Sequence, residues 1–196
     1  LDGTINLTTG AYRDTYDALM THYPKLKLNI AKWWIRFEDP EVKRICVENW
    51  DKDGDGELSM EEAAAVSSIG TMFRGNKHLK TLKDLRFFTS LDDIAQQIVA
   101  NCPNLVEVWV PESMTFIGSW FSLRTPNLRT VVMCGKTPPR LSSNFMYIDT
   151  GYNYPKDLKI FVPDDAVAKY KQKWANISNG NTKIIKFIHP MSEYQE

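Results

Sequence analysis

The sequence predicts an α+β fold in which a helical region precedes a short solenoid of parallel strands. Two observations support this prediction. An acidic twelve-residue loop, Asp51–Glu62, lies between two segments with helical patterns. Beyond it, apolar motifs recur at a spacing of 23 residues, which is typical of stacked strand-and-turn units. We therefore expect two regions, residues 1–66 and 67–196, with a C-terminal cap over about 158–190.

The first 38 residues form a segment that we expect to cover the open end of the solenoid. Aromatic and apolar side chains at helical spacing, from Tyr12 to Tyr23, predict a helix over residues 11–22 that Pro24 ends. The pattern of the apolar segment 26–35 does not distinguish helix from strand. Because the first unit of a solenoid exposes apolar strand edges, a helical cap is expected here.

A helix is expected on each side of the acidic loop. Asp39 is the candidate N-cap of the first helix, over residues 39–50. Ser59, followed three residues later by Glu62, has the pattern of a capping box and predicts a second helix over residues 60–67. The predicted order is therefore helix, loop, helix.

The loop places oxygen-bearing side chains at alternate positions. Ca²⁺ prefers six to eight oxygen ligands, and an EF-hand loop supplies them from positions 1, 3, 5, 7, 9 and 12, with glycine at position 6 for a sharp turn. Gly56 occupies position 6, and the loop carries six acidic residues against one lysine. Such a concentration of negative charge is repulsive unless a cation relieves it. The candidate calcium ligands are Asp51, Asp53, Asp55, the backbone carbonyl of Glu57, Ser59 (often through water) and Glu62, whose carboxylate supplies two oxygens.

The role expected for this ion is structural. EF-hands that sense calcium usually come in pairs, in which the residues at loop position 8 pair as a short strand. Leu58 holds that position, and the sequence contains no second loop. We therefore expect calcium to clamp the two helices together rather than to open a groove for a target.

The second region contains a repeat. The motif Pro-Asn-Leu-x-x-Val begins at Pro103 and again at Pro126, and Ile94 and Ile117 keep the same spacing of 23 residues. This period, with an asparagine nearby, is the signature of leucine-rich repeats, each a short strand plus a turn or short helix. Neighbouring repeats stack into a curved solenoid because one repeat cannot bury its apolar edge alone. The asparagines are expected to satisfy backbone groups where the chain turns.

The C-terminal cap is expected to contain a helix over residues 166–174 and a final strand over residues 184–188. Pro163 and the two aspartates after it suit the start of that helix. Together the two elements would cover the last repeat.

Several runs of sequence carry a family resemblance. The runs are Val42–Val66, Phe87–Leu91, Cys102–Leu105, Val110–Gly118 and Ile160–Trp174. Together they resemble the BspA-like leucine-rich-repeat surface proteins of gut and oral anaerobic bacteria. The resemblance covers roughly residues 39 to 190.

This resemblance implies an extracytoplasmic bacterial protein, secreted or on the cell surface, that binds a protein or glycan by an adhesive surface. It supplies no ligand-contact residue. The leader of such a protein is expected to be absent from this chain, and any surface anchor to lie outside it. One departure from the family pattern is that Cys102 is replaced by Thr125 in the next repeat. The repeats are few, so we expect a monomer with a short binding face.

The three cysteines, Cys46, Cys102 and Cys134, show neither zinc-binding spacing nor a CxxC motif. They are expected to be small buried residues of the core. The alternative is a disulfide between Cys102 and Cys134 in an oxidising compartment, whose geometry the sequence does not determine.

The candidate binding surface is the outward face of the repeat strands. Trp109 lies between two valines on a predicted strand, so alternation turns it outward, together with Glu107. The equivalent position in the next repeat is Val132. Other aromatic residues, from Phe116 to Tyr154, either belong to the core or form a stacking platform, and we expect the core.

A non-enzymatic binding protein is the function expected from these features. Scattered histidines and the absence of catalytic motifs argue against an enzyme, although a carboxylate pair acting on polysaccharide is the alternative. Equal numbers of basic and acidic residues, 24 of each, argue against nucleic acid or an anionic membrane as the main partner. No apolar stretch is long enough to span a bilayer.

Overall fold

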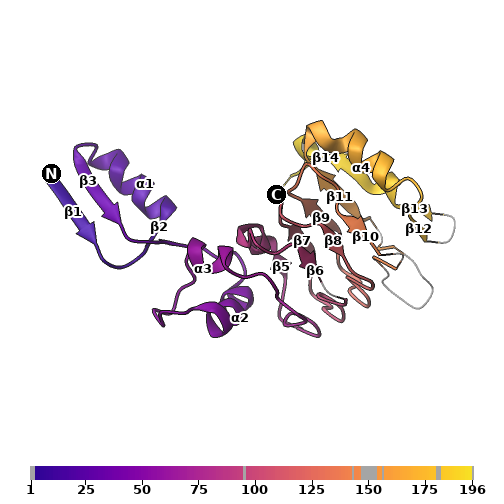
Figure 1. Cartoon of the computed structure of the whole chain (residues 1–196), viewed down its shortest axis with the longest axis horizontal. Helices are drawn as coiled ribbons and strands as arrows, with labels where there is room; N and C mark the ends of the chain where they lie inside the picture. Colours follow the sequence, from indigo (N-terminus) through magenta and orange to yellow (C-terminus); the bar gives the residue numbers. More distant parts are fainter. Residues whose placement is uncertain are drawn as a thin grey trace.

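The computed structural model describes residues 3–94, 96–142, 144–146, 154–155, 157–179 and 182–195. In these ranges the fold is mixed α and β, with mostly parallel sheets and few helices, which confirms the predicted α+β class. The elements follow one another along a curved row (Figure 1). Helices α2 (Pro40–Trp50) and α3 (Met60–Ala64) lie between an N-terminal unit, residues 3–34, and the sheets of the C-terminal region. None of the helices in these ranges has the length and apolar character that crossing a membrane requires.

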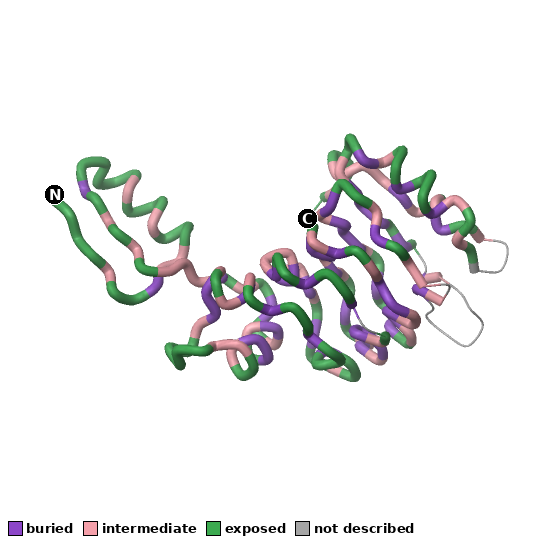
Figure 2. Tube along the Cα trace, viewed as in Figure 1, coloured by how far each residue is buried: buried purple, intermediate pink, exposed green. Residues whose placement is uncertain are grey.

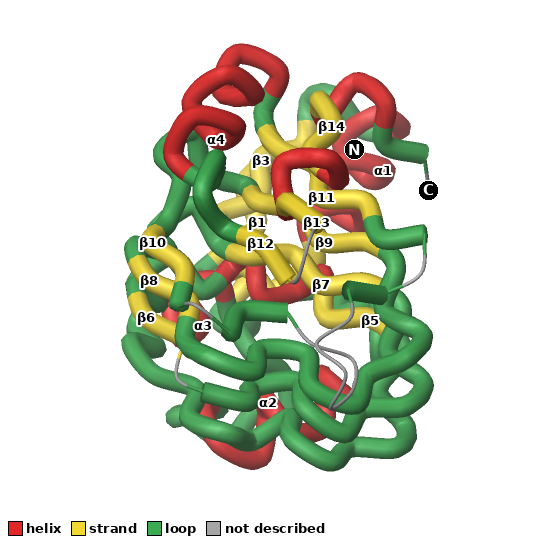
Figure 3. Tube along the Cα trace, turned by 90° about the vertical axis from the view of Figure 1, so that its right-hand side faces the viewer, coloured by secondary structure: helices red, strands yellow, loops and turns green. Residues whose placement is uncertain are grey.

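Two parallel sheets form the C-terminal two thirds of the described chain, and Figure 3 shows them on different sides of the stack. The larger sheet has the strand order β14-β11-β9-β7-β5, and the smaller one has the order β10-β8-β6. Successive coils of the chain each add a strand to the larger sheet, and three of them also add one to the smaller sheet. The strands are β5 (Thr81–Leu82), β6 (Asp93–Ile94), β7 (Glu107–Val110), β8 (Phe116–Ile117), β9 (Thr130–Met133), β10 (Arg140–Leu141), β11 (Lys159–Val162) and β14 (Ile188–Pro190).

Two of the strand pairings follow the 23-residue period of the sequence. Val108 pairs with Val131 in the larger sheet, and Ile94 pairs with Ile117 in the smaller one. All four side chains are fully buried in one continuous apolar core. Figure 2 shows the buried positions recurring along successive coils. Equivalent positions of neighbouring coils therefore fill the same layer of the core.

The asparagines of the repeated motif connect adjacent coils. Asn104 Nδ2 donates a hydrogen bond to the carbonyl of Lys77 (2.6 Å), and Asn127 Nδ2 donates to the carbonyl of Pro103 (2.7 Å). Each side chain satisfies a backbone acceptor of the preceding coil, as the sequence predicts. Since these carbonyls lie at turns, they would otherwise depend on water.

Cys102 and Thr125 make equivalent contacts in spite of their different chemistry. The Cys102 thiol donates to the Phe73 carbonyl (3.0 Å), and the Thr125 hydroxyl donates to the Val99 carbonyl (2.6 Å). The exchange of Cys102 for Thr125 in the second copy of the motif therefore preserves a hydrogen bond to the preceding segment of the chain. Cys102 and Cys134 are both free thiols, so the alternative of a disulfide between them is wrong.

Residues 3–34 form a strand–helix–strand unit instead of the expected helical cap. Strands β1 (Gly3–Leu7) and β3 (Leu26–Ile30) pair in parallel, with helix α1 (Arg13–His22) between them in the chain. Their register joins residues that are 23 apart, and Asn29 Nδ2 donates to Asn6 Oδ1 (2.7 Å). The period of the C-terminal repeats thus occurs here as well, in the short runs that contain these two asparagines.

Helix α1 does not cover the five-stranded sheet or the three-stranded sheet. It begins at Arg13 rather than at residue 11, because the two residues before it form β2 (Ala11–Tyr12), which pairs with β4 (Trp33–Trp34). No residue of α1 is buried. Its tyrosines contact their own unit instead, as where the ring of Tyr16 packs edge-on against Trp33 at 5.2 Å. Helical spacing correctly indicated a helix but not the surface on which it packs.

The first strand of the larger sheet is covered by the start of α2. Asp39, only 3% exposed, accepts hydrogen bonds from the backbone N–H groups of Lys80 (2.7 Å) and Thr81 (3.0 Å). Its other oxygen accepts from the N–H of Glu41 (2.9 Å) and caps the helix, as predicted. One carboxylate therefore joins the helical region to the edge of the sheet.

The C-terminal cap contains the expected helix. A 3₁₀ turn, η2 (Asp164–Ala166), leads into α4 (Val167–Lys173). Tyr170 and Trp174 are buried beneath it, and their polar atoms donate to backbone carbonyls at 2.8 Å and 3.0 Å. These hydrogen bonds attach the helix to the last turns of the repeats.

The final strand lies later in the chain than predicted. Residues 184–187 form the 3₁₀ turn η3 (Ile184–Phe187), and β14 begins only at Ile188. The buried positions in this stretch, Ile184 and Ile188, are four residues apart, which suits a helical turn as well as a strand.

Two short pairings complete the described strands: β2 with β4, and β12 (Ser178–Asn179) with β13 (Thr182–Lys183).

Candidate metal site and binding face

Three carboxylates of the acidic loop come together. One oxygen each from Asp51, Asp53 and Asp55 lies within 4.8 Å of the others. Asp51 fixes the turn, since its two carboxylate oxygens accept hydrogen bonds from the backbone N–H groups of Gly54 (2.7 Å) and Gly56 (2.8 Å). This cluster could hold a metal ion.

Two glycines give the loop its tight course. Gly54 and Gly56 have φ angles of 73° and 83°, a left-handed conformation that residues with a Cβ disfavour. The sequence motif predicts the requirement at Gly56. The structure adds the same requirement at Gly54, which lies at loop position 4.

Ser59 and Glu62 close the loop on themselves. The Ser59 hydroxyl and backbone N–H both donate to Glu62 Oε2 (2.8 Å and 2.9 Å), and the Glu62 N–H donates back to the Ser59 hydroxyl (3.2 Å). This arrangement is the predicted capping box of α3, although the helix ends at Ala64 rather than at residue 67. The other Glu62 oxygen accepts from the N–H of Lys52 (2.8 Å), at the start of the loop. The structure thus brings Glu62 to the loop but does not group it with the three aspartates.

The side chain of Glu57 points away from the aspartates. Its Oε1 forms an ion pair with Lys43 Nζ (2.5 Å) on α2. A hydrogen bond to Glu57, after the larger effect of burial, also raises the pKa of Tyr12. Only the backbone carbonyl of this residue was expected to act as a ligand, and the side-chain contacts are compatible with that role.

Lys32 and Trp34, which sequence patterns did not identify, complete the surroundings of the cluster. The Lys32 ammonium contacts both Asp53 and Asp55, and the Trp34 indole N–H donates to Asp55 Oδ2 (3.0 Å). The hydrogen bond from Lys32 is the main cause of the lowered pKa of Asp55. These residues are about 21 positions from their partners, so no local spacing in the sequence indicates the contact.

Trp34 is fitted closely into its place. A Cβ on Gly10 would lie 2.4 Å from Trp34 Nε1, so only glycine permits this approach. On another side the ring of Tyr12 packs edge-on at 5.5 Å. The N-terminal unit therefore delivers its indole to the loop in a defined orientation.

A strand-like segment pairs with loop position 8. The backbone N–H of Ile35 donates to the carbonyl of Leu58 (2.8 Å), and Trp34 forms an antiparallel bridge with Ser59. Ile35 and Leu58 are both fully buried. The chain thus supplies from residues 34–35 the strand partner that a second EF-hand loop usually provides.

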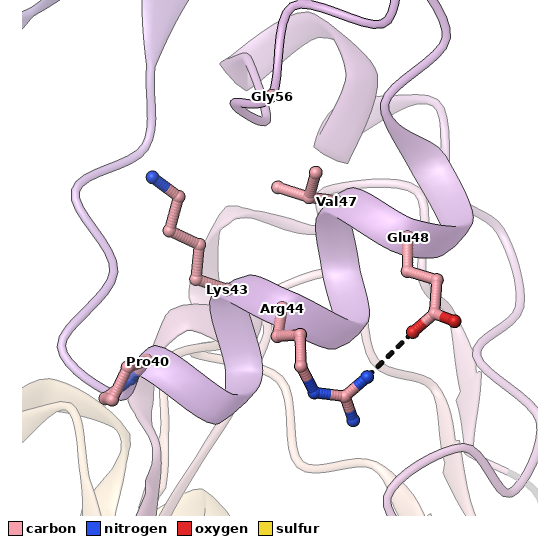
Figure 4. A pocket seen from close by; sticks show the side chains of 6 residues that line it. All are labelled: Pro40, Lys43, Arg44, Val47, Glu48 and Gly56. Atoms are coloured by element: carbon pink, nitrogen blue, oxygen red, sulfur yellow. Dashed lines mark hydrogen bonds and ion pairs between the residues drawn. The ribbon is translucent and has the colours of Figure 1, made fainter.

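A shallow hollow of about 570 Å³ lies between α2 and the acidic loop (Figure 4). The charged side chains that line it are already paired: Lys43 with Glu57, and Arg44 with Glu48 at 2.8 Å and with Glu41 at 2.9 Å. None of the three aspartates lines this hollow, so it is separate from the candidate metal site. It offers no uncommitted charge for a ligand.

The second candidate site is the outward side of the larger sheet, which we name the Trp109 face and define by Glu107, Trp109, Val132 and Phe161. Trp109, Val132 and Phe161 lie side by side on neighbouring strands. Trp109 and Glu107 are partly exposed, as alternation predicts, whereas Val132 is only 2% exposed and offers little surface of its own.

The Trp109 face is in contact with Tyr194, another residue that sequence patterns did not identify. The Tyr194 ring packs edge-on against Trp109 (5.7 Å) and Phe161 (5.3 Å). Its hydroxyl donates to Glu107 Oε1 (2.7 Å), which also accepts from Trp109 Nε1 (2.6 Å). Because Glu107 and Tyr194 are separated by 87 positions, only the folded chain reveals this contact.

The other aromatic candidates do not form one platform. Phe121 is fully buried, whereas Phe116 lies on the smaller sheet beneath the Arg140 guanidinium (4.8 Å). Tyr154 packs against Phe187. Tyr147 and Tyr152 lie outside the described residues.

Comparison with known proteins found no match for this chain. No protein-family model matches the chain. No curated protein matches it either.

Proposed function

We propose that this protein is a non-enzymatic, calcium-binding leucine-rich-repeat protein that recognises a protein or glycan. Calcium would have a structural role in the loop Asp51–Glu62, and the Trp109 face would bind the ligand. The observation that carries the proposal is the position of the loop. The three-aspartate cluster lies in the loop between α2 and α3, and Lys32 and Trp34 of the N-terminal unit contact it.

Calcium suits the chemistry of the loop. Its donors are carboxylate, hydroxyl and carbonyl oxygens, which hard cations prefer. Asp51, Asp53 and Asp55 already converge, while Ser59 and Glu62 lie at the end of the same loop and bond to each other. Coordination would require Glu62 to exchange its capping contacts for the ion. Mg²⁺ is the competing ion, but it accepts fewer ligands and a stricter geometry.

A structural role is supported by the pairing partner of Leu58. In paired EF-hands that residue meets a second loop, whereas here it meets Ile35 of the same chain. The core on both sides of this contact is buried, so the two helices have little freedom to open. The ion would hold α2 and α3 together.

The repeat interpretation is supported by contacts that recur at about 23 residues. Asn104 and Asn127 bond to the preceding coil, as do Cys102 and Thr125. The resemblance to BspA-like surface proteins extends this proposal to an extracytoplasmic protein with an adhesive or ligand-binding role.

Terbium luminescence would test the metal site directly. Tb³⁺ replaces Ca²⁺ at oxygen ligands, and the indole of Trp34 beside Asp55 can transfer excitation energy to it. We expect sensitised emission that Ca²⁺ competes away and that Trp34→Phe strongly reduces. In parallel, Ca²⁺ should raise the melting temperature, because a ligand that binds the folded state stabilises it. Equal melting curves in calcium and in chelator would contradict the structural role.

The binding role has a separate test. The full chain and its Trp109→Ala variant would be screened for binding to matrix proteins and oligosaccharides. The expected result is at least one ligand whose binding the substitution abolishes. A broad screen without any Trp109-dependent ligand would leave the binding role without support.

A further inference from the structure

We propose that the Trp109 face binds a peptide segment presenting a tyrosine side chain, and that the protein's own residues Met191–Tyr194 occupy this site as an internal competitor. The inference rests on the binding role proposed above and specifies its ligand class. It is carried by the way in which Tyr194 is held.

The site has distinct apolar and polar ends. Trp109 and Phe161 flank the Tyr194 ring with interplanar angles of 87° and 83°. At the hydroxyl end, Glu107 Oε1 accepts the phenolic hydrogen, and Lys83 Nζ lies 3.8 Å from the other Glu107 oxygen. The Glu107 and Lys83 side chains are only 14% and 12% exposed, so the acceptor is largely shielded from solvent. This arrangement matches a phenol, which has an apolar ring and one donor at its tip.

The segment that carries Tyr194 is attached weakly elsewhere. The 3₁₀ turn η4 (Met191–Glu193) has no buried residue. Its other contacts include a hydrogen bond from the Ser192 N–H to Asp164 Oδ1 (2.9 Å), an exposed pair between His189 and Glu193 (3.0 Å) and packing against β11, and the Tyr194 hydroxyl also contacts Lys83. Releasing the segment therefore removes no buried residue of its own, and its main cost is the exposure of Phe161 and Trp109 beneath Tyr194.

Space for a longer partner lies beside the tyrosine. An open hollow of about 530 Å³ adjoins Trp109 and has Met191 on its border. Its lining is apolar around Met133 and Cys134, with the Lys136–Asp165 ion pair (2.6 Å) also present. This volume is within the usual range for ligand pockets. Residues next to the tyrosine of a partner peptide could enter it once Met191 moves.

A peptide fits this site better than a sugar does. Sugars stack on the flat face of an aromatic ring, and at Trp109 that face is near the Arg86 guanidinium, 5.0 Å from the ring centre. The rings of the site meet Tyr194 edge-on rather than as an open platform. The occupant that the fold already accepts is itself a peptide.

An internal occupant lowers the apparent affinity for an external one. A tethered segment has an effective concentration of about millimolar, so the external peptide competes with it. Removing the Tyr194 ring should expose the site and strengthen binding by about tenfold or more, since two ring contacts and a charge-assisted hydrogen bond are lost from the competitor. Tyr194→Phe, which keeps the ring, should produce a smaller gain.

The test uses the full chain and a fluorescent peptide, Pro-Met-Ser-Glu-Tyr-Gln, which is the sequence of residues 190–195. Fluorescence anisotropy would compare the wild type with Tyr194→Phe and Tyr194→Ala. Tyr23→Ala, which removes a 39% exposed tyrosine from the N-terminal unit, is the matched control. We expect affinity to rise in the order wild type, Tyr194→Phe, Tyr194→Ala, while the control equals wild type. A second substitution, Glu107→Gln or Trp109→Ala, should remove the gain, as should alanine in place of tyrosine in the peptide.

Two results would overturn the inference. One is the absence of saturable peptide binding to Tyr194→Ala that retains its melting transition. The other is binding that Trp109→Ala leaves unchanged. An oligosaccharide that binds Tyr194→Ala through Trp109, when the peptide does not, would exclude the peptide class and preserve the broader binding role. If neither binds, the binding role fails as well, whereas the terbium measurement tests the metal site independently.

Discussion

The backbone N–H of Ile35 donates to the carbonyl of Leu58 at 2.8 Å, which gives the acidic loop a strand partner from its own chain. In paired EF-hands the residue at loop position 8 pairs with a second loop, and here Ile35 takes the place of that partner. The segment that makes it also carries Trp34 onto Asp55 and follows Lys32, whose ammonium contacts Asp53 and Asp55. The acidic loop and the N-terminal unit are therefore in direct contact.

Glu62→Gln should weaken Ca²⁺ binding by at least about tenfold, because it removes charge from the ligand that supplies two oxygens. Glutamine still serves in a capping box but loses one of the two acceptor oxygens, the one that Lys52 N–H uses, so the metal-free melting temperature should fall only slightly. Calorimetry with Ca²⁺ and Mg²⁺ measures the effect. Glu61→Gln removes the same charge one residue away and should bind like wild type. Equal affinities for the two variants would argue against Glu62 as a ligand.

Lys32→Met should strengthen Ca²⁺ binding by about two- to tenfold, because the ion no longer displaces an ammonium group from Asp53 and Asp55. The same change should lower the melting temperature without metal, since the aspartates lose their counter-charge. Lys27→Met, an exposed lysine on β3, is the matched control. Weaker calcium binding in Lys32→Met would show that the lysine supports the site rather than competing for it.

Asp84 should make stability depend on pH. Burial raises the pKa of this carboxyl from 3.8 to about 6, with smaller opposing effects of the Glu38 N–H and Arg86. The folded state then holds the proton more tightly than the unfolded state. Stability should consequently fall by about 3 kcal/mol as pH rises from about 4 to about 6, and remain level above it.

Asp84→Asn should abolish that slope, which urea denaturation at several pH values between 4 and 7 would measure. Asp93→Asn, an exposed carboxylate on β6, should retain it. If wild type and Asp84→Asn show parallel pH profiles, Asp84 does not carry the buried charge that the fold implies.

Asp39→Ala should destabilise the fold by about 2–4 kcal/mol, because three backbone N–H groups lose their acceptor. Asp39→Ser separates two roles of the carboxylate: serine still caps α2 but is too short to reach β5. Its cost, measured by urea denaturation, should lie between those of wild type and alanine. A serine variant as unstable as alanine would assign the whole effect to the sheet contact.

Local features of this chain could be predicted from the sequence and distant contacts could not. The cap at Asp39, the capping box of Ser59 and Glu62, and the turn at Gly56 depend on neighbours within a few residues. The contacts of Lys32 and Tyr194 join positions 21 and 87 residues apart, and no spacing rule connects them. Recurrence at 23 residues correctly indicated two pairings, β7 with β9 and β6 with β8, because copies of one motif occupy equivalent places in neighbouring strands.

The N-terminal unit illustrates why the packing of some predicted elements could not be predicted from the sequence. Tyrosines at helical spacing predicted α1, but the same spacing cannot say whether the helix covers another region or only its own strands. β1 and β3 pair over five residues, but their sequences resemble each other only close to Asn6 and Asn29, in runs too short to distinguish from chance. The segment 26–35, whose pattern did not distinguish helix from strand, contains strand β3. Its pairing partner is β1, which lies 23 residues earlier in the chain.

The carboxylate of Asp39 also limits how far the sheet can grow. An uncovered edge strand is a template on which another chain can add a strand, and filaments form when such addition repeats. Here the N–H groups of Lys80 and Thr81 at the β5 edge are already engaged by a buried negative charge. At the opposite edge, β14 ends in Pro190, which has no N–H to offer. Both edges of the larger sheet thus offer few free backbone N–H groups to which another chain could add a strand.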